Sequence, residues 1–497
     1  MDANRAIAGT NCSNREVVSV SHHHGMNVLK GLDAFCHYGH EPTDEDRFGR
    51  LFPLAPLYVA PDQLRALGAQ DGPMDGGEAF DRTDSVAAGQ IFFGQFVDHD
   101  ITLDVTTSLA SVVENGTVPN VRTPTLDLDN VYGMGPEATP FLYQGKGDNA
   151  GVKLLTGADG TAADQSDDHA KNDLWRTPDG TAVIGDPRND ENRIVSQLQL
   201  AMIRFHNAIV DRLRDETDLE GGELFEEARR LARWHYQYVV VEDYLPKICG
   251  RAIVDEIKGR GRQFYTPHAG TPFIPIEFSV AAYRFGHSMM PERVQVQKGG
   301  TAYELFGYTL GSGFAPLDED EAVVDWHELV ETDEDREVQN AQKLDTKMAT
   351  DLLDLPFIGD GESSLATRNL LRGQVFMLPS GEEVARAIGR DETEIEHVSQ
   401  AARDMASPAA DLASGIPLWF YNLAEAEHIG RETTPGNVEP SEGLGPVGAR
   451  IVAETLYGLI ELDDRSYLAT NRNWDPETDG VGVATLGQML TFAGASS

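Results

Sequence analysis

Three polar side chains follow the apolar run Ile91-Phe92-Phe93: Gln95, Asp98 and His99. Their spacing of i, i+3 and i+4 places them on one face of a helix. An amide, a carboxylate and an imidazole are costly to bury together unless each has a partner. The pattern therefore predicts that the end of a buried helix binds a ligand. The next residue, Asp100, breaks the apolar pattern again and indicates a second binding event, back to back with the first.

A later loop, Thr123-Pro-Thr-Leu-Asp-Leu-Asp129, presents oxygen atoms at alternate positions. The side chains of Thr123, Asp127 and Asp129, with the backbone carbonyl of Thr125, suit a hard cation such as Ca²⁺, which takes roughly six to eight oxygens. An Asx-rich turn is the alternative interpretation in a chain as acidic as this one.

A helix is predicted to begin with Asp186 as its N-cap and Pro187 at its first position, and to run to about Arg214. Arg188 and Glu191 lie three residues apart and are predicted to share a face. They are either groups of a site or an ordinary ion pair within the helix.

A second histidine, His287, follows Gly286 and lies nearly one turn after Arg284. Such a histidine is more often a hydrogen-bonded core residue than a ligand, but Gly286 removes a side chain where a flat ligand would approach. Farther along, Asn369 and Arg372 are one turn apart.

These segments, in this order, resemble the signatures of the animal-type haem peroxidases, the superfamily of myeloperoxidase, lactoperoxidase and peroxidasin. The resemblance extends from Gly94 to Gly381, and Leu378-Pro-Ser-Gly381 also resembles bacterial members, so the chain is identified as a prokaryotic member. It implies a mainly α fold, with a single large helical haem-peroxidase domain over residues 46–497, few short strands and long surface loops. Residues 1–45 are expected to form an N-terminal surface segment.

Hydrophobic periodicity indicates the helices that must position these groups. The clearest patterns lie at Glu223–Tyr244, Ile276–Met290, Glu382–Ile388, Asp411–Glu427 and Gly448–Ile460. Because the segments that must converge on one haem are spread over most of the chain, its middle is predicted to be a single fold.

The resemblance implies haem b as the cofactor and a role for each polar residue. His287 would be the proximal iron ligand, and Asn369 would accept its second N–H group. On the distal side, His99 would act as general base and then general acid. Arg188 would stabilise the charge that develops as the O–O bond breaks, and Gln95 would hydrogen-bond the distal water.

Two carboxylates match those that form esters with the haem in the family, Asp98 and Glu191, so a covalent link through both is implied. Asn192 stands where myeloperoxidase has a methionine bonded to a haem vinyl group, which rules out a third link of that kind. Arg284, at a haem propionate, and Arg372 are expected to bind the cofactor.

The resemblance also implies one bound Ca²⁺, held by Asp100 together with the loop residues Thr123, Thr125, Asp127 and Asp129. The family usually has an aromatic residue at Thr125 and a serine at Asp129. The first change is harmless if the ligand is the backbone carbonyl, and the second adds negative charge, which should not weaken cation binding.

The implied activity is reduction of hydrogen peroxide, with oxidation of halide, thiocyanate or small phenolic donors through a ferryl haem. A fatty-acid dioxygenase of the same fold is an alternative. Such enzymes have a tyrosine three residues before the proximal histidine, where this chain has Arg284; Tyr283 is one position too early and is expected to face another side of the helix. They also lack the ester-forming pair.

Two further alternatives remain. A haem- and Ca²⁺-binding adhesion-type protein with incidental activity has no Arg-Gly-Asp sequence or appended module to support it. Catalase-like disposal of peroxide differs only in the reductant, and the sequence does not separate it from the main hypothesis. The oligomeric state is equally open.

The formal net charge of −41 comes from 81 acidic residues against 40 basic ones, of which only nine are lysine. This field would repel nucleic acid and anionic membranes, which are therefore not expected as partners. A surface of this kind suits concentrated salt, so a halophilic source is one hypothesis, with simple acidic drift as the other.

Cys12, Cys36 and Cys249 are too few and too widely spaced for a disulfide framework. The first residues lack the basic and apolar regions of a signal peptide, and no apolar run has the length of a membrane span. A cytoplasmic location is the default expectation, with non-classical export as the alternative.

Overall fold

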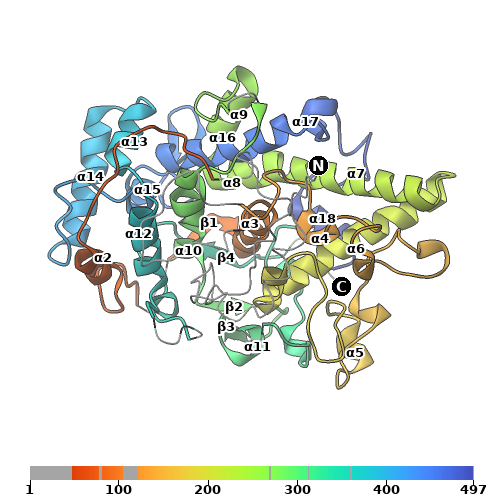
Figure 1. Cartoon of the computed structure of the whole chain (residues 1–497). Helices are drawn as coiled ribbons and strands as arrows, with labels where there is room; N and C mark the ends of the chain where they lie inside the picture. The colour runs from red at the N-terminus through yellow and green to blue at the C-terminus, as the bar shows by residue number, and fades with distance from the viewer. Residues whose placement is uncertain are drawn as a thin grey trace, which may run out of the picture.

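The computed structural model describes residues 48–77, 81–103, 120–267, 270–311, 313–334, 336–356, 358 and 361–495. The expected surface segment of residues 1–45 lies outside these ranges, as do Cys12 and Cys36, and the domain boundary at residue 46 stays a prediction. The described chain is mainly α-helical, which confirms the predicted fold class (Figure 1). Its strands form three antiparallel pairs: β1 (Arg82–Ala87) with β4 (Asn340–Gln342), β2 (Arg293–Gln295) with β3 (Ala302–Glu304), and β5 (Arg431–Thr434) with β6 (Asn437–Glu439).

Helix α3 (Ala88–Ile101) lies at the centre of the molecule, and all but two of its side chains are buried. The pairing of β1 with β4 places its first turn, where Ala88 N–H donates to Gln339 O and Gly89 N–H to Leu329 O. These bonds satisfy two of the N–H groups that a helix start leaves open. A Cβ on Gly89 would lie 2.6 Å from Leu329 O, so only glycine permits this approach.

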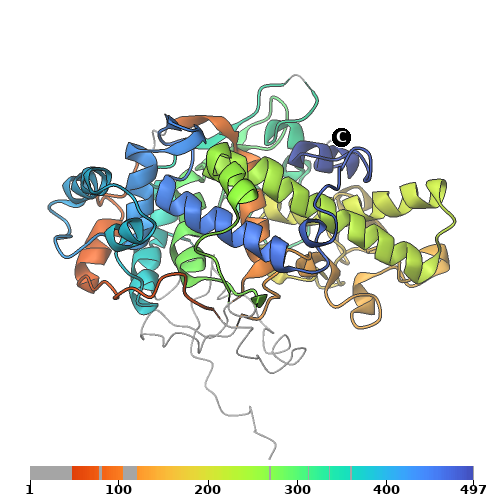
Figure 2. The same cartoon turned by 90° about the horizontal axis from the view of Figure 1, so that it is seen from above.

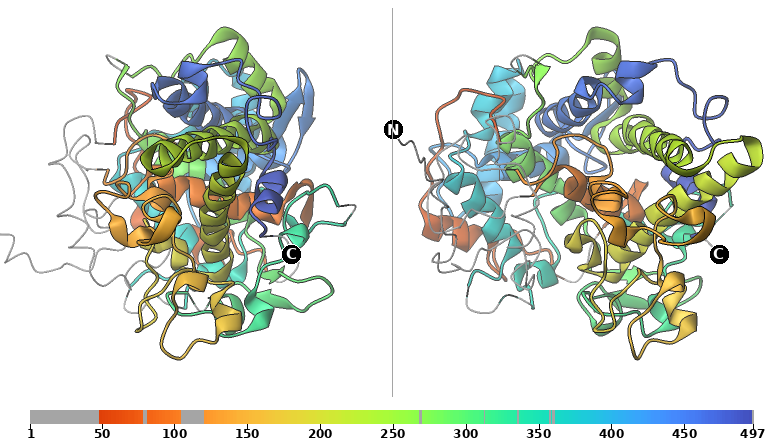
Figure 3. Two further views of the ribbon diagram at one scale, coloured as in Figure 1. Left: turned by 90° about the vertical axis from the view of Figure 1, so that its right-hand side faces the viewer. Right: turned by 45° about the vertical axis from the view of Figure 1, so that its right-hand side comes forward.

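Two long helices, α6 (Arg193–Glu216) and α7 (Gly221–Val239), pack side by side, and α6 also packs against α3 (Figures 1 and 3). Seen from above, α7 extends away from the end of the molecule formed by α13 (Gly381–Ala387) and α14 (Glu392–Ala406) (Figure 2). Helix α7 continues as a π turn over Val240–Tyr244, so the helix predicted at Glu223–Tyr244 is confirmed.

Helices α12 (Leu365–Val375), α15 (Leu418–His428) and α16 (Pro446–Leu462) surround residues 277–289. The predicted regular helix at Ile276–Met290 is wrong in detail. The segment is a π turn at Glu277–Ala281, then a 3-10 turn at Ala282–Phe285, then α10 (Gly286–Met289). Ala281 leaves helical geometry, with φ −128° and ψ −75°. Such π turns recur at functional sites.

Two predicted helix starts are also wrong. The helix expected from Pro187 is a separate 3-10 turn at Pro187–Asp190. Helix α6 begins only at Arg193, because the Asn192 side chain caps it by accepting from Val195 N–H. The helix expected from Asp411 begins at Leu418, directly after Pro417.

The remaining helices are short or peripheral: α2 (Pro61–Gly68), α4 (Asp129–Tyr132), α5 (Asp167–Ala170), α8 (Leu245–Cys249), α9 (Arg251–Arg260), α11 (Tyr308–Gly311), α17 (Tyr467–Thr470) and α18 (Leu486–Phe492). One hydrophobic cluster runs through the described residues and includes α3, α6, α7 and α16. Among the described helices, none combines the length and the apolar character needed to cross a bilayer.

Candidate active site and cation cluster

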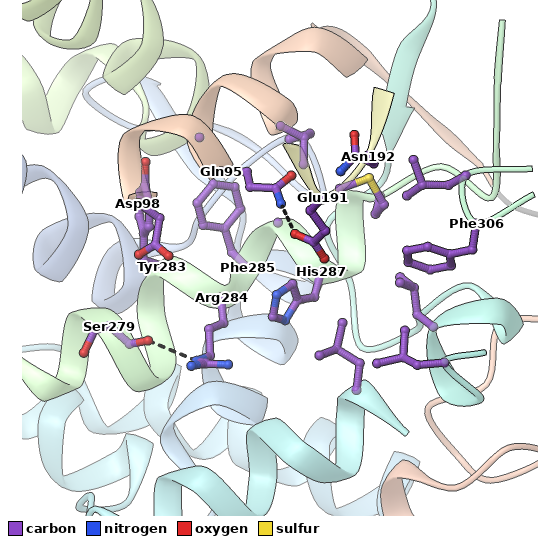
Figure 4. Close-up of a pocket in the computed structure, with 18 of the residues that line it drawn as sticks. Gln95, Asp98, Glu191, Asn192, Ser279, Tyr283, Arg284, Phe285, His287 and Phe306 are labelled. Carbon is purple, nitrogen blue, oxygen red and sulfur yellow. Dashed lines mark hydrogen bonds between the residues drawn. The ribbon is translucent and has the colours of Figure 1, made fainter. Parts of the chain in front are cut away.

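One cavity gathers residues from α3, from the segment after Pro187 and from residues 279–287 (Figure 4). It holds about 880 Å³ of empty space, a volume that includes open solvent. Its polar lining residues are Gln95, Asp98, Glu191, Asn192, Ser279, Tyr283, Arg284 and His287. The structure therefore brings together three of the segments that the sequence predicted to converge.

Two carboxyl groups face this cavity, those of Asp98 and Glu191, and both are half-buried. Thr102 Oγ1 donates to Asp98 Oδ1 at 3.0 Å, and Gln95 Nε2 donates to Glu191 Oε2 at 3.1 Å. Burial raises the pKa of Asp98, and that of Glu191 well above its ordinary value, although the charge of Arg188 acts in the opposite direction. A ligand that removed these charges would therefore relieve a desolvation cost.

His99 and Arg188 are not among the lining residues of this cavity, and they are almost completely buried, with 0% and 1% exposure. Arg188 Nη2 donates to the backbone carbonyl of His99 at 2.9 Å and to Asp186 Oδ2 at 2.7 Å. The structure thus unites the two predicted catalytic residues through a main-chain contact. Arg188 forms its ion pair with Asp186. The alternative interpretation, an ion pair between Arg188 and Glu191, is therefore not the arrangement in the structure.

His287 also lines the cavity. Asn369 contacts its ring, with 2.8 Å between Asn369 Nδ2 and His287 Nδ1. The sequence predicted this contact, but the donor and the acceptor are exchanged. Arg284 Nη1 donates to Asn369 Oδ1 at 2.8 Å, and a guanidinium can only donate. The amide oxygen is therefore turned to Arg284 and the NH₂ group to His287, so the expectation that Asn369 accepts from His287 is wrong for this arrangement.

The two arginines predicted to bind the cofactor differ in their placement. Arg284 lines the cavity, where its Nε also donates to Ser279 O at 3.0 Å. Arg372 lies outside the set of lining residues, with its guanidinium carbon 5.0 Å from the ring centroid of Phe376. The cofactor role of Arg372 stays a prediction.

The structure corrects the expected direction of the Tyr283 side chain, which lines the same cavity as His287 and lies near Asp98 (Figure 4). The expectation that it faces elsewhere assumed a regular α-helix. The π and 3-10 turns over residues 277–285 change the angle between successive side chains, and Phe278 stacks on Tyr283 with ring centroids 4.5 Å apart. No pattern of residue types in the sequence signals this irregularity.

The second predicted site is also assembled, since carboxylate oxygens of Asp100, Asp127 and Asp129 lie within 4.8 Å of one another. Asp100 Oδ1 and Asp127 Oδ1 are buried with no hydrogen-bond partner. Burial and repulsion by Asp129 raise the pKa of Asp127 to about 7 and hold that of Asp100 well above its ordinary value. Carboxylates that repel one another, two of which have an oxygen without a hydrogen-bond partner, fit a divalent cation.

The two threonines predicted as ligands lie on the same loop. Thr123 Oγ1 donates to Asp129 Oδ2 at 3.1 Å, and Thr125 Oγ1 is buried without a hydrogen-bond partner. Helix α4 begins at Asp129 because Leu128 adopts the left-handed conformation, with φ 62°, and its N–H donates to Asp100 Oδ2 at 3.3 Å. This turn places the loop against the end of α3.

Arg122, which the sequence analysis did not single out, joins the two sites. It donates to Asp129 Oδ1 at 3.1 Å and to Asp186 Oδ2 at 2.6 Å. Burial alone would raise the pKa of Asp186, but the guanidiniums of Arg122 and Arg188 hold it well below its usual range. Arg465 also pairs with the cluster, with 3.4 Å between its Nη2 and Asp127 Oδ2.

Residues 114–380, more than half of the chain, match the family model for animal haem peroxidase. The chain therefore belongs to the animal haem peroxidase family, whose members hold haem and usually calcium. The match begins after the segment Gly94–Asp100, so the assignment of that segment depends on the geometry described above.

The relatives with curated descriptions align with this chain over only part of their own length. The chain is 29% identical over 130 residues to dual oxidase 1 of Caenorhabditis elegans and 29% identical over 178 residues to the peroxidasin homolog pxn-2 of the same organism. These stretches cover 26% and 34% of this chain but 8% and 13% of the relatives. The chain thus spans a small fraction of those proteins.

Two solved structures share the fold over almost the whole chain. Peroxidase A from Dictyostelium discoideum has a TM-score of 0.61 and 16% identity, and covers 91% of this chain and 93% of its own. A fatty acid alpha-dioxygenase of Arabidopsis thaliana has a TM-score of 0.55 and 17% identity, and covers 89% of this chain and 75% of its own. At these identities the likeness shows the fold alone.

The cation cluster predicts about one Ca²⁺ per chain in a metal analysis of the purified protein. Asp127→Asn removes one ligand and should lower the Ca²⁺ occupancy. It should also lower the unfolding temperature, because the remaining buried carboxylates lose the positive charge of the cation. Asp218→Asn, on an exposed residue, is the matched control. An unchanged unfolding temperature after exhaustive chelation would show that no cation supports this cluster.

Proposed function

We propose that the chain is a haem peroxidase that reduces hydrogen peroxide and oxidises halide, thiocyanate or small phenolic donors. One observation carries this proposal: a single cavity is lined by an imidazole, His287, together with the carboxyls of Asp98 and Glu191. When bound, haem supplies the iron redox chemistry, and the protein supplies positioning and electrostatics.

The cavity residues fit haem in three ways. His287 presents an imidazole to the space, which is a usual axial ligand of haem iron. Gly286 beside it has no side chain, and a Cβ there would already touch Ile91 at 3.4 Å. Asp98 and Glu191 hold charges that burial disfavours, and an ester to the haem would remove each charge. Arg284 would meet a propionate.

On the distal side, His99 would take a proton from hydrogen peroxide and return it to the leaving oxygen. Arg188 would stabilise the negative charge that develops as the O–O bond breaks. Its guanidinium is preorganised for this task, because Asp186 fixes it through both Nε and Nη2.

On the proximal side, a neutral His287 that binds iron through Nε2 must carry its proton on Nδ1. The NH₂ group of Asn369 now faces that nitrogen. The amide must therefore turn its oxygen to His287, which requires Arg284 to release it. A propionate would supply Arg284 with the replacement partner, so cofactor binding and the proximal hydrogen bond would be linked.

A fatty-acid dioxygenase is the second candidate, because Tyr283 lines the cavity and the fold is shared with such enzymes. The two cavity-facing carboxyls favour the peroxidase. Stopped-flow measurement of the peroxide-treated protein with chloride, bromide, iodide, thiocyanate and phenols tests the proposal. Oxygen uptake with a long-chain fatty acid, and no turnover of any of these donors, would reverse the preference.

His287→Ala should lose haem or hold it weakly, since the variant removes the iron ligand. Haem content per chain and the Soret spectrum measure this loss, with His169→Ala, a histidine remote from the cavity lining, as the control. Full occupancy with an imidazole-ligated spectrum in the His287 variant would show that another residue binds the iron.

His99→Ala should keep haem and slow the reaction with peroxide by about 10²–10⁴-fold, the usual contribution of a general acid–base residue. Stopped-flow absorbance of the haem band gives the rate. A rate equal to that of the wild type would remove His99 from the mechanism.

The proposed esters predict that acidified organic solvent leaves haem on the protein after peroxide treatment, whereas the double variant Asp98→Ala, Glu191→Ala releases it. Wild-type protein never exposed to peroxide is the control and should be only partly linked. Complete extraction from the peroxide-treated wild type would mean that both carboxyls act only through hydrogen bonds.

A further inference from the structure

A chain of three hydrogen bonds leads away from the ring of His99 into the core. His99 Nδ1 lies 2.7 Å from Asn189 Oδ1, Asn189 Nδ2 donates to Gln199 Oε1 at 2.8 Å, and Gln199 Nε2 donates to the backbone carbonyl of Asn130 at 3.1 Å. All four residues have 0% exposure. These hydrogen bonds connect α3, the turn at Pro187–Asp190, α6 and α4, and they are shielded from solvent.

The last member of this chain fixes its direction. A backbone carbonyl can only accept, so Gln199 must turn its NH₂ group to Asn130 and its oxygen to Asn189. Asn189 must then offer its own NH₂ group to Gln199 and its oxygen to His99. Because an amide oxygen carries no proton, the proton of this hydrogen bond belongs to His99 Nδ1. Reversing the two amides would set the oxygen of Gln199 against the carbonyl of Asn130.

We propose that Asn189 and Gln199 are positioning residues that hold neutral His99 in the tautomer protonated at Nδ1, with Nε2 left as the proton acceptor. The inference rests on the proposed peroxidase function, in which His99 must first accept a proton. A histidine with its proton on Nε2 presents a donor there and is not a base at that position. Asn189 therefore keeps the ring in the form that can begin the reaction.

The amide also acts without adding charge near the ring. The charged groups packed around His99 are Arg188, which bonds to its carbonyl, Asp186, and the flanking residues Asp98 and Asp100. Asp186 is committed to Arg122 and Arg188 rather than to the imidazole. The contact that Asn189 makes with the ring is thus that of a neutral amide.

The same short turn holds His99 at two places, since Arg188 donates to its carbonyl and the next residue, Asn189, accepts from its ring. The approach to Asn130 depends on Gly185, where a Cβ would lie 2.5 Å from Asn130 O. The turn can therefore lie against α4 and α3 together.

The test compares Asn189→Ala with Asn189→Asp in the haem-loaded protein. The alanine variant should react with peroxide about 10- to 100-fold more slowly at unchanged haem content, as when a residue that orients a functional histidine is removed. The aspartate variant should recover much of the rate. Its acid limb should move to higher pH, because a carboxylate stabilises the imidazolium form. Asn207→Ala, which removes an amide that bonds Leu154, is the control.

A second measurement does not depend on turnover. In protein labelled with ¹⁵N-histidine, in the diamagnetic ferrous carbon monoxide form, the His99 signals are assigned by their loss in His99→Gln. They should show the proton on Nδ1 in the wild type and a mixture of tautomers in Asn189→Ala. Gln199→Ala should give a milder shift in the same direction, and it replaces Asn189→Ala if that variant does not fold.

The inference is overturned if wild-type His99 carries its proton on Nε2, or if the Asn189 variants keep the wild-type tautomer, rate and pH profile. Its failure is distinct from that of the proposed function. If His99→Ala itself reacts normally with peroxide, the peroxidase mechanism is wrong. If His99→Ala is inactive and the Asn189 variants are normal, only the role of Asn189 is lost.

Discussion

The carboxylate of Asp186 is the interaction on which the distal half of the site depends. It is completely buried, and it accepts from Arg122, from Arg188 and from the backbone N–H of Arg188. A buried ion is tolerated only when its partners satisfy it fully, and loss of one partner leaves an uncompensated charge. Through Asp186 the cation cluster, the guanidinium of Arg188 and the carbonyl of His99 form one connected network.

The acids of this region differ in pKa because their partners differ, although burial raises the pKa of each of them. Asp186 stays ionised between two guanidiniums, whereas Asp98 and Glu191 face an open cavity with raised pKa values. Their surroundings alone keep one carboxyl ionised and raise the pKa of the other two.

The sequence predicted the groups of the site because their types and spacing have no packing use, as for Gln95, Asp98 and His99. Residues that matter only through tertiary contacts were missed. Arg122, Asn189 and Gln199 look like ordinary polar residues until the fold sets a carboxylate, a ring and a carbonyl beside them. The helical architecture was predicted from periodicity, and its irregular turns were not, since a π turn has the same apolar pattern as a helix.

Helix α6 begins later than predicted, and Arg188 bonds Asp186 rather than Glu191. In a continuous helix, residues 188 and 191 would share a face and would both reach the cavity. The chain instead forms a short 3-10 turn at Pro187–Asp190 and leaves helical geometry at Asn192, where φ is −140° and ψ is 165°. Arg188 bonds to Asp186, Asn189 to the ring of His99, Asp190 to Arg176, and Glu191 to Gln95 at the cavity wall. Four consecutive residues thus serve four different partners, and the Asn192 cap begins α6 directly after them.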